Sequence, residues 1–408
     1  MHIHSEAERR LRLGHPWLYR EAIRKQRGEG VPGDLAAVYD RRDRFLALGL
    51  YDPTSPIRTR ILQRYKPAEI DARWFAERLA KARYRRQALI ARRDTTAYRL
   101  VHGENDGLPG LVLDQYDRTL VLKLYTAAWI PHLGSVLEAV GAVIPSARIV
   151  LRLGRAVHHA TPHLHGCSDG LTLLGKPPSG PVGFLEHGLR FEADVVRGHK
   201  TGFFLDQRDN RARIEPLSRG RTVLDVFAYT GAFSVHAARG GAVAVTSVEM
   251  SRAALQMAAR HYALNRTYPA VAKIRHRFID GEAFKMLEQL ARRRERFGLV
   301  LLDPPAFAKT KAEVRAALAA YAKLVRLGLR VAEPGGVLCL SSCTGQVSAE
   351  AFFAVVHRAA GQAGWSLREL ARTGHPIDHP VAFPEGDYLK GLIASCEPLA
   401  ELRPHRGA

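Results

Sequence analysis

The 408-residue sequence has little cysteine, no long apolar run and too few acidic residues to balance its basic ones. Its four cysteines are Cys167, Cys339, Cys343 and Cys396, and their spacing matches neither a disulfide framework nor a zinc site. No stretch approaches the ~18 apolar residues of a membrane span. The N-terminal MHIHSEAERRLRLGH lacks the apolar core of a secretory signal. We therefore expect a reduced, cytoplasmic protein with no membrane anchor and no bound metal.

The shortage of acids leaves a strong positive charge on the chain. Lys and Arg number 61 against 40 for Asp and Glu, which gives a formal charge of +21. The excess continues through the whole sequence. A surface of this sign favours polyanionic partners, and a nucleic-acid backbone is the first candidate. A genome rich in G and C would explain arginine in place of lysine, but it would not explain the surplus of basic over acidic residues.

The first part of the chain has the pattern of small mixed domains. Short alternating runs between residues 33 and 63 are typical of a small β-barrel or meander. The segment 15–23 is expected to begin a helix, and residues 74–92 have apolar side chains at helical spacing among many arginines. The apolar runs 111–117 and 120–125 predict two strands joined by a hairpin turn. The histidine-rich segment 158–167 is interpreted as a loop.

After the Pro-rich break at residues 177–181 the pattern changes to strands and helices in alternation. The expected strands are 222–227, 244–249, 275–280, 298–303 and 336–342. Because helical runs separate them, they predict a parallel, doubly wound sheet of the α/β class. The expected domains are residues 1–70, 71–190 and 191–398, and the tail after Pro398 is expected to be frayed.

The turn after the first of these strands is a candidate cofactor loop. In an open α/β sheet, the carboxyl ends of the strands line the ligand crevice. Residues Asp225 to Gly231 (DVFAYTG) join that strand to a helix, and the small Thr230 and Gly231 let the backbone approach a ligand at the helix start. The loop lacks the Gly-x-Gly-x-x-Gly pattern, which disfavours a dinucleotide. A tight turn without any ligand would have a similar sequence.

Acidic residues end the next three strands. Glu249, followed by Met250 and Ser251, can accept hydrogen bonds from both hydroxyls of a ribose. Ser251 could instead be only the N-cap of the next helix, and the two roles are compatible. Asp280 ends the third strand, where an adenine amino group would lie. The fourth ends at Asp303-Pro304-Pro305, in which the prolines stiffen the loop.

The last parallel strand is followed by Cys343, next to Thr344 and Gly345. A thiolate that adds to carbon 6 of a pyrimidine makes carbon 5 nucleophilic enough to accept a methyl group from a sulfonium. A base then removes the carbon-5 proton and the cysteine leaves. A buried structural cysteine is the common alternative, and Cys339 inside the strand fits it. The strand ends together suit methyl transfer from S-adenosylmethionine to a nucleic-acid base through a cysteine adduct.

These motifs resemble the RlmI-like group of class I S-adenosylmethionine-dependent methyltransferases, which make 5-methylcytosine in 23S ribosomal RNA. The similarity extends over nearly the whole chain. It is carried by HPWLYREAI, LGLYDPTSPIRTRIL, GENDGLPGLVLDQYD, GHKTGFFLDQRDNR, VLDVFAYTGAFSVHAARGGA, DPPAF, SSCTG and DHPVAFPEGDYLKG. The resemblance implies an N-terminal PUA-like β-barrel that binds RNA, a middle α+β domain and a Rossmann-like catalytic domain. It also implies S-adenosylmethionine as the cofactor, 23S ribosomal RNA as the partner and a homodimer.

The resemblance also assigns roles to individual residues. Cys343 would be the nucleophile. Asp303 would be its neighbour and would also bind the cofactor. The implied cofactor-binding residues are Gln207, Asp225, Phe227, Tyr229, Gly231, Glu249, Met250, Ser251, Asp280, Asp303 and Pro304. Of these, Phe227, Tyr229 and Gly231 would border the methionine part, Glu249 would hold the ribose and Asp280 the adenine.

The choice of base depends on this resemblance. Many RNA cytosine methyltransferases carry a second cysteine just before the paired prolines, whereas here Asp303 stands there, as in the resembled family and in uracil-5 methyltransferases. The alternatives are therefore a uracil-5 methyltransferase and a base-nitrogen methyltransferase in which Cys343 is idle. A non-catalytic RNA-binding assembly factor that keeps the fold is a third.

Overall fold

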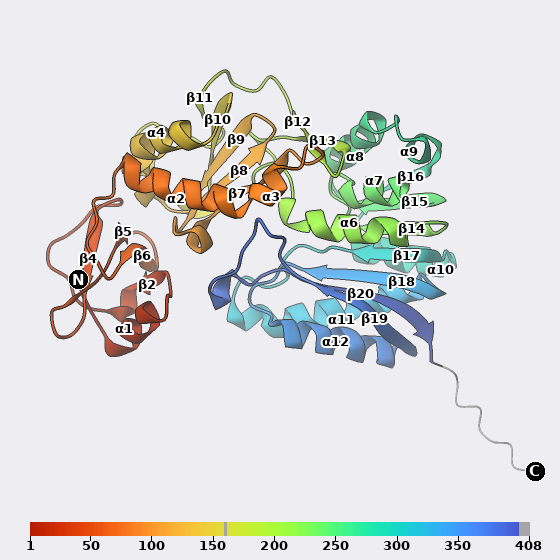
Figure 1. The fold of residues 1–408 in the computed structure, drawn as a ribbon. Coiled ribbons are helices and arrows are strands. Elements are labelled where there is room, and N and C mark those ends of the chain that lie inside the picture. Colours follow the sequence, from red (N-terminus) through yellow and green to blue (C-terminus); the bar gives the residue numbers. More distant parts are fainter. Residues whose placement is uncertain (159–160, 400–408) are drawn as a thin grey trace, which may run out of the picture. The chain divides into compact units, whose positions relative to one another are not determined.

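The computed structural model describes residues 1–158 and 161–399 (Figure 1). The chain divides into two compact units. The first unit contains residues 1–188, 192–205 and 377–384, and the second contains residues 189–191, 206–376 and those from 385 onward. The three-domain division into residues 1–70, 71–190 and 191–398 stays a prediction. His159 of the histidine-rich segment and the tail from residue 400 lie outside the described residues.

The first unit begins with a six-stranded sheet in the order β2-β6-β5-β4-β1-β3. Its strands are β1 (His2–Ile3), β2 (Trp17–Tyr19), β3 (Ile23–Lys25), β4 (Leu35–Tyr39), β5 (Phe45–Tyr51) and β6 (Ile57–Arg64), accompanied by α1 (Ser5–Arg12) and η1 (Arg20–Ala22). The neighbours β4, β5 and β6 pair antiparallel in sequence order. The meander predicted between residues 33 and 63 is therefore confirmed.

The prediction that the segment 15–23 begins a helix is wrong. Trp17 to Tyr19 form β2, which pairs antiparallel with β6, and Leu18 is buried in the core of this sheet. A single 3-10 turn, η1, then leads into β3. Backbone pairing with a strand about 40 residues later in the chain decides this segment, because the apolar and aromatic side chains fit a half-buried sheet surface.

A second, five-stranded sheet of the first unit has the order β11-β10-β9-β8-β7. Its elements are β7 (Ala97–His102), β8 (Leu111–Tyr116), β9 (Thr119–Leu124), β10 (Arg148–Leu153), β11 (Thr172–Leu174), α2 (Ala72–Arg85), α3 (Gln87–Ile90), α4 (Leu133–Val143), α5 (Arg155–His158), η2 (Gly103–Asp106), η3 (Ala127–His132) and η4 (Thr161–His163). The hairpin of β8 and β9 is confirmed, with Asp117 at a positive φ of 52° in its turn. The helix expected over residues 74–92 forms as α2 and α3.

The second unit is built on a seven-stranded sheet in the order β16-β15-β14-β17-β18-β20-β19. Its strands are β14 (Thr222–Val226), β15 (Ala244–Glu249), β16 (Arg275–Asp280), β17 (Phe297–Leu302), β18 (Ala332–Ser342), β19 (Trp365–Thr373) and β20 (Lys390–Pro398). The first five are parallel, as predicted, and β20 runs antiparallel between β18 and β19. A separate pair of strands, β12 (Val182–Glu186) and β13 (Leu189–Ala193), forms a two-stranded sheet.

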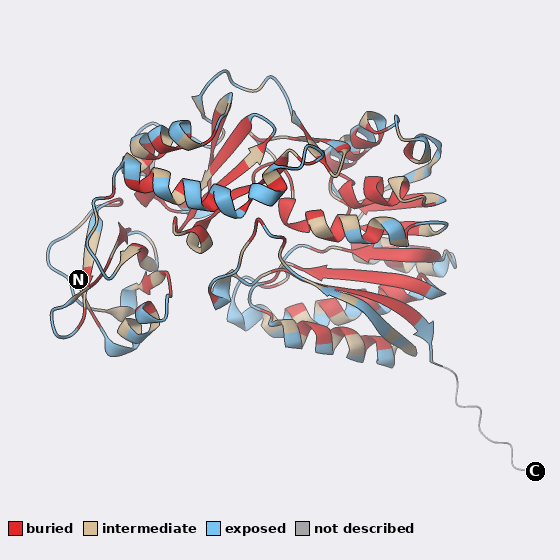
Figure 2. Cartoon of the chain, viewed as in Figure 1, coloured by how far each residue is buried: buried red, intermediate tan, exposed pale blue. Residues whose placement is uncertain are grey.

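Helices cover both faces of the seven-stranded sheet. They are α6 (Arg208–Leu217), α7 (Ala232–Arg239), α8 (Arg252–Leu264), α9 (Pro269–Lys273), α10 (Ala283–Arg292), α11 (Val314–Arg330) and α12 (Ala349–Gln362), with the short turns η5 (Leu205–Gln207), η6 (Lys311–Glu313) and η7 (Pro384–Gly386). The central strands are buried along their length (Figure 2). One face packs Val223 and Leu299 against Phe233 of α7, and the other packs α11 and α12. Burial on both faces explains the continuous apolar runs of the sequence.

This topology sets the position of a ligand crevice within the second unit. The strand order reverses at β14, because β15 and β16 lie on one side of it and β17 and β18 on the other. In open α/β sheets, ligands bind outside the carboxyl ends of the strands at such a switch point. The residues that follow β14, β15, β17 and β18 therefore border the expected site. No described helix is long and apolar enough to cross a bilayer.

Candidate functional site

The loop after β14 has an unusual backbone. Phe227 and Tyr229 both adopt a positive φ, of 63° and 48°, which costs bulky residues free energy and persists only where the surroundings hold it. Gly231 follows at a φ of 71°, and a Cβ at this position would lie 2.8 Å from the Cβ of Ala258 on α8. Only glycine therefore fits at the start of α7. The strained backbone therefore lies in the loop that joins the carboxyl end of β14 to α7.

Glu249 at the end of β15 is held by two backbone groups. One carboxylate oxygen accepts a hydrogen bond from the Tyr229 N–H at 3.0 Å, and the other accepts one from the Ser251 N–H at 2.9 Å. A carboxylate offers about four lone-pair positions, so two remain for the hydroxyls of a ribose. The geometry is compatible with the role predicted for Glu249.

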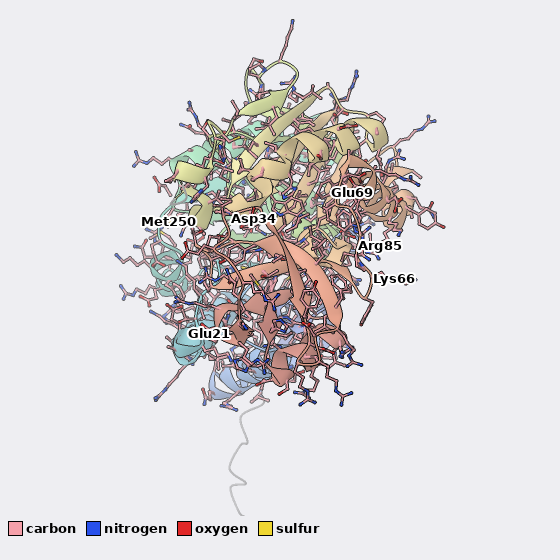
Figure 3. All side chains as sticks on the ribbon, turned by 90° about the vertical axis from the view of Figure 1, so that its left-hand side faces the viewer. Glu21, Asp34, Lys66, Glu69, Arg85 and Met250 are labelled. Carbon is pink, nitrogen blue, oxygen red and sulfur yellow. The ribbon has the colours of Figure 1, made fainter. Side chains whose placement is uncertain are left out.

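Asp280 ends β16 directly beside Glu249, since the two residues are partners in the parallel ladder. Its carboxylate is partly exposed and accepts a hydrogen bond from Arg252 Nε at 2.5 Å. Met250 is 72% exposed, and Figure 3 labels its side chain. Ser251 Oγ accepts the Ala254 N–H, so the serine is the N-cap of α8. That N-cap alternative for Ser251 is confirmed, and its contact with a cofactor stays a prediction.

Asp225 lies fully buried in β14, and its burial raises its pKa to about 6. Ser234 of α7 donates a hydrogen bond of 2.6 Å to one of its carboxyl oxygens, and Ser234 in turn lies 2.6 Å from Ser247 Oγ. The other oxygen, Oδ1, and the buried Thr230 Oγ1 have no hydrogen-bond partner among residues 1–158 and 161–399. Buried polar atoms are rarely left unpaired, so these two fit a loop that completes its hydrogen bonds with a polar ligand.

The loops after β17 and β18 contact each other. Gln207 donates from Nε2 to Asp303 Oδ1 at 2.7 Å, and Asn210 donates to Gln207 Oε1 at 2.5 Å, which fixes the orientation of the amide. The Cys343 sulfur lies 3.9 Å from the carbonyl oxygen of Pro304. Since Leu302 and Leu340 are partners in the ladder, the two loops leave adjacent strand ends. The predicted grouping of Cys343 with the Asp303 loop is therefore present in the structure.

Cys343 differs from the neighbouring cysteines of the sheet. Its side chain is half-buried just past β18, whereas Cys339 is buried within that strand and Cys396 within β20. Burial raises the pKa of Cys339 to about 12 and that of Cys396 to about 11, which keeps both thiols protonated near neutral pH. The role of Cys343 as a nucleophile stays a prediction, as do the roles of the other site residues.

Two groups contribute to the site without having been singled out from the sequence. Lys390 and Tyr321 both contact the residues that follow β18. A lysine inside the apolar run YLKGLIAS was the available signal for the first. Nothing local in the sequence distinguishes Tyr321 from a core residue of α11.

Comparison with known proteins identifies the class. The family described as S-adenosylmethionine-dependent methyltransferase matches residues 152–395, and a PUA-like domain matches residues 1–64. A methyltransferase from Streptococcus mutans, 22% identical, has the same fold with a TM-score of 0.81 over 97% of this chain and 99% of its own. The similarly related SMU.776, solved with SAH, gives a TM-score of 0.82. The protein is thus an S-adenosylmethionine-dependent methyltransferase with an N-terminal PUA-like domain.

Curated relatives narrow the assignment. A protein named ribosomal RNA large subunit methyltransferase from Deinococcus radiodurans is 46% identical over 397 residues, which is 96% of each chain. Ribosomal RNA large subunit methyltransferase I from Pseudoalteromonas translucida is 36% identical over 400 residues, covering 96% of this chain and 98% of its own. The chain belongs to this methyltransferase family. Its cofactor is S-adenosylmethionine, which supplies an activated methyl group on a sulfonium sulfur.

The N-cap role of Ser251 leads to a first prediction. We expect Ser251→Ala to lower the free energy of unfolding by about 1 kcal/mol, because the Ala254 N–H loses its capping acceptor. The dissociation constant for S-adenosylmethionine should change less than about threefold, since Glu249 keeps its contact with the Ser251 backbone. Urea unfolding and calorimetry measure the two quantities. Ser348→Ala, at the equivalent position of α12, is the matched control.

Proposed function

We propose that the protein methylates carbon 5 of a cytosine in 23S ribosomal RNA through a covalent adduct with Cys343. The observation that carries the proposal is the position of this thiol. It is half-buried at the carboxyl end of β18, next to the Asp303-Pro304 loop and on the same edge of the sheet as Glu249. The names of the relatives support ribosomal RNA as the substrate, and we place the enzyme in the cytoplasm. The homodimer implied by the resemblance stays a prediction.

In the proposed reaction the Cys343 thiolate adds to carbon 6 of the cytosine, and the electron pair of the 5,6 double bond becomes available at carbon 5. Carbon 5 then attacks the methyl group on the sulfonium sulfur of S-adenosylmethionine. The methyl–sulfur bond breaks, and its electrons remain on the sulfonium sulfur, which becomes a neutral thioether. A base then takes the carbon-5 proton. The bond between the cysteine sulfur and carbon 6 breaks, its electrons return to sulfur, and the double bond is restored.

The chain has residues that could bind the cofactor and residues that could position the reacting groups near the target base. Glu249 would orient the ribose through its two remaining lone-pair positions, and the buried Asp225 Oδ1 and Thr230 Oγ1 would complete their hydrogen bonds at the loop. The Gln207 amide, which is fixed by Asn210, would hold the Asp303 carboxylate in one orientation. A target base would have to be unpaired or flipped from its stack to reach the thiol.

Charge and exposed side chains support RNA as the partner. The net charge of +21 provides a salt-dependent attraction to phosphates. In the first unit, α2 exposes Arg73, Lys81 and Arg83 together with Tyr84, whose side chain is 70% exposed. Cations and an exposed aromatic ring suit phosphate contacts and stacking on an unpaired base. We propose that α2 contributes to RNA binding.

The test is methyl transfer in vitro, followed by mapping of the product. Purified protein is incubated with labelled S-adenosylmethionine and unmodified 23S ribosomal RNA, either naked or in a large-subunit particle. Mass spectrometry of the digested RNA should show 5-methylcytosine at one position. A 5-methyluridine product would move the assignment to the uracil-5 alternative, and methylation of a ring nitrogen would make the adduct unnecessary. Failure to bind S-adenosylmethionine by calorimetry would favour an assembly factor.

A further inference from the structure

Lys390 is a buried cation in the sheet of the second unit. It begins β20, opposite Ser342 at the end of β18, and its side chain is only 4% exposed. Its ammonium group donates hydrogen bonds to the carbonyl oxygens of Thr344, at 2.9 Å, and Val347, at 2.5 Å. Both carbonyls belong to the segment that follows Cys343. The ammonium group therefore anchors this segment to β20.

Other buried groups hold the same segment. The Tyr321 hydroxyl of α11 lies 2.7 Å from both Ser342 Oγ and Thr344 Oγ1. The Thr344 hydroxyl oxygen also accepts the Phe307 N–H of the Asp303 loop at 3.1 Å. The residues on either side of Cys343 are thus fixed by three separate elements, α11, β20 and the loop after β17. Little freedom remains for the backbone that presents the thiol.

Anchoring alone does not require a charge. A neutral donor could bind two carbonyl oxygens, whereas burying an ammonium group carries a desolvation penalty. Both hydrogen-bond acceptors of Lys390 Nζ are neutral carbonyls, and the carboxylates that interact with it electrostatically, Asp387 and Glu350, are exposed. Within residues 1–158 and 161–399, no buried carboxylate accepts a hydrogen bond from this ammonium group. Its field is available to a nearby anion.

The nearby group that could become an anion is the thiol. Burial lowers the pKa of Lys390, and Asp387, Cys343 and Glu350 counteract that shift, in that order. Tyr321 also interacts electrostatically with both Cys343 and Asp303. A nearby carboxylate such as Asp303 disfavours a thiolate, whereas a nearby ammonium group favours it. Lys390 is a buried cation that interacts electrostatically with Cys343 and binds the segment that follows it.

We propose that Lys390 is a positioning residue for Cys343, which both fixes the segment after the thiol and stabilises the thiolate by its charge. The inference rests on the proposed function, because it assumes that Cys343 reacts as a thiolate. A purely structural lysine would affect the stability of the fold or the accessibility of the thiol. A lysine with the proposed role also changes the pH at which the thiol ionises.

The experiment measures alkylation of Cys343 by iodoacetamide as a function of pH in the full-length protein, with the modified peptide quantified by mass spectrometry. We expect Lys390→Met to move the midpoint of the rate profile upward by about one pH unit. The rate at neutral pH should then fall about tenfold, because the thiolate fraction falls in that proportion. Binding of S-adenosylmethionine by calorimetry should stay within about twofold.

Two further variants separate charge from anchoring. Tyr321→Phe removes both hydroxyl contacts without changing the charge, so it should lower kcat while the alkylation midpoint stays in place. Lys390→Arg keeps the charge and should retain the wild-type midpoint. If the Met variant does not fold by circular dichroism, Lys390→Gln replaces it as the neutral variant. An unchanged midpoint in a folded neutral variant overturns the inference.

The inference and the proposed function fail in distinguishable ways. If a Cys343→Ala protein still methylates RNA, the nucleophile assignment is wrong, yet alkylation of the Lys390 variants still reports whether the ammonium acts on the sulfur. If methylation requires Cys343 but the midpoint does not move, only the role of Lys390 is wrong. A uniform change of alkylation rate at every pH would indicate that Lys390 acts on the accessibility of the thiol alone.

Discussion

Cys343→Ala is expected to abolish methylation of the RNA substrate while binding of S-adenosylmethionine is retained. The loss should be on the order of 10⁴-fold or more, because the nucleophile of the covalent step is removed. Cys339 lies within β18, and burial raises its pKa to about 12, so it cannot supply a thiolate. Transfer of labelled methyl groups and calorimetry measure the two properties.

The matched control is Cys167→Ala, which removes a half-buried thiol from a loop of the first unit. Cys167→Ala should methylate RNA at the wild-type rate if the loss of activity in Cys343→Ala depends on the position of that cysteine and not on the number of thiols. A second readout is trapping: RNA with 5-fluorocytosine at the target position blocks proton removal, so wild-type protein should form a stable adduct that Cys343→Ala does not. Wild-type methylation activity in Cys343→Ala would exclude the covalent mechanism.

The sheet of the second unit could be predicted closely from the sequence. The strand expected at residues 222–227 forms at Thr222–Val226, and the one expected at 244–249 forms at Ala244–Glu249. Strands buried on both faces leave uninterrupted apolar runs, and the helices between them fix their parallel direction. The segment 15–23 could not be predicted in this way. Its pairing partner, β6, lies far along the chain, and local sequence does not encode that contact.

The candidate site likewise contains residues that could be predicted from the local sequence and residues that could not. Glu249, Asp280 and Asp303 could be predicted because each is an acidic residue at the end of a predicted strand, and this is a local signal. The signal at Lys390 is weaker: a lysine interrupts the apolar run YLKGLIAS, but a lysine in a strand is ordinarily on a solvent-exposed face. Its burial depends on the direction of β20 beside β18 and on carbonyl groups that turn inward after Cys343. Those are properties of the assembled sheet.

The second large effect is expected at Glu249. We expect Glu249→Gln to raise the dissociation constant for S-adenosylmethionine about 10- to 100-fold, since a hydrogen bond to a charged group contributes about 1.5–3 kcal/mol. The structure adds a second reason for a large effect. The carboxylate accepts the Tyr229 N–H with one oxygen and the Ser251 N–H with the other, whereas an amide offers a single oxygen. Its NH2 group would face one of these donors.

A matched control exists in Glu313, which accepts two backbone N–H groups, those of Lys309 and Thr310, in the capping box of η6 before α11. Both groups donate to the same oxygen, Oε2, so Glu313→Gln removes the charge but keeps an acceptor for both, and it should leave the dissociation constant unchanged. Calorimetry of Glu249→Gln with S-adenosylmethionine and with adenosine then shows which part of the cofactor loses its contact. If Glu249 binds the ribose, both ligands weaken by the same factor, because both carry the two hydroxyls. An effect confined to S-adenosylmethionine would instead mean that Glu249 acts through the Tyr229 loop on the methionine part.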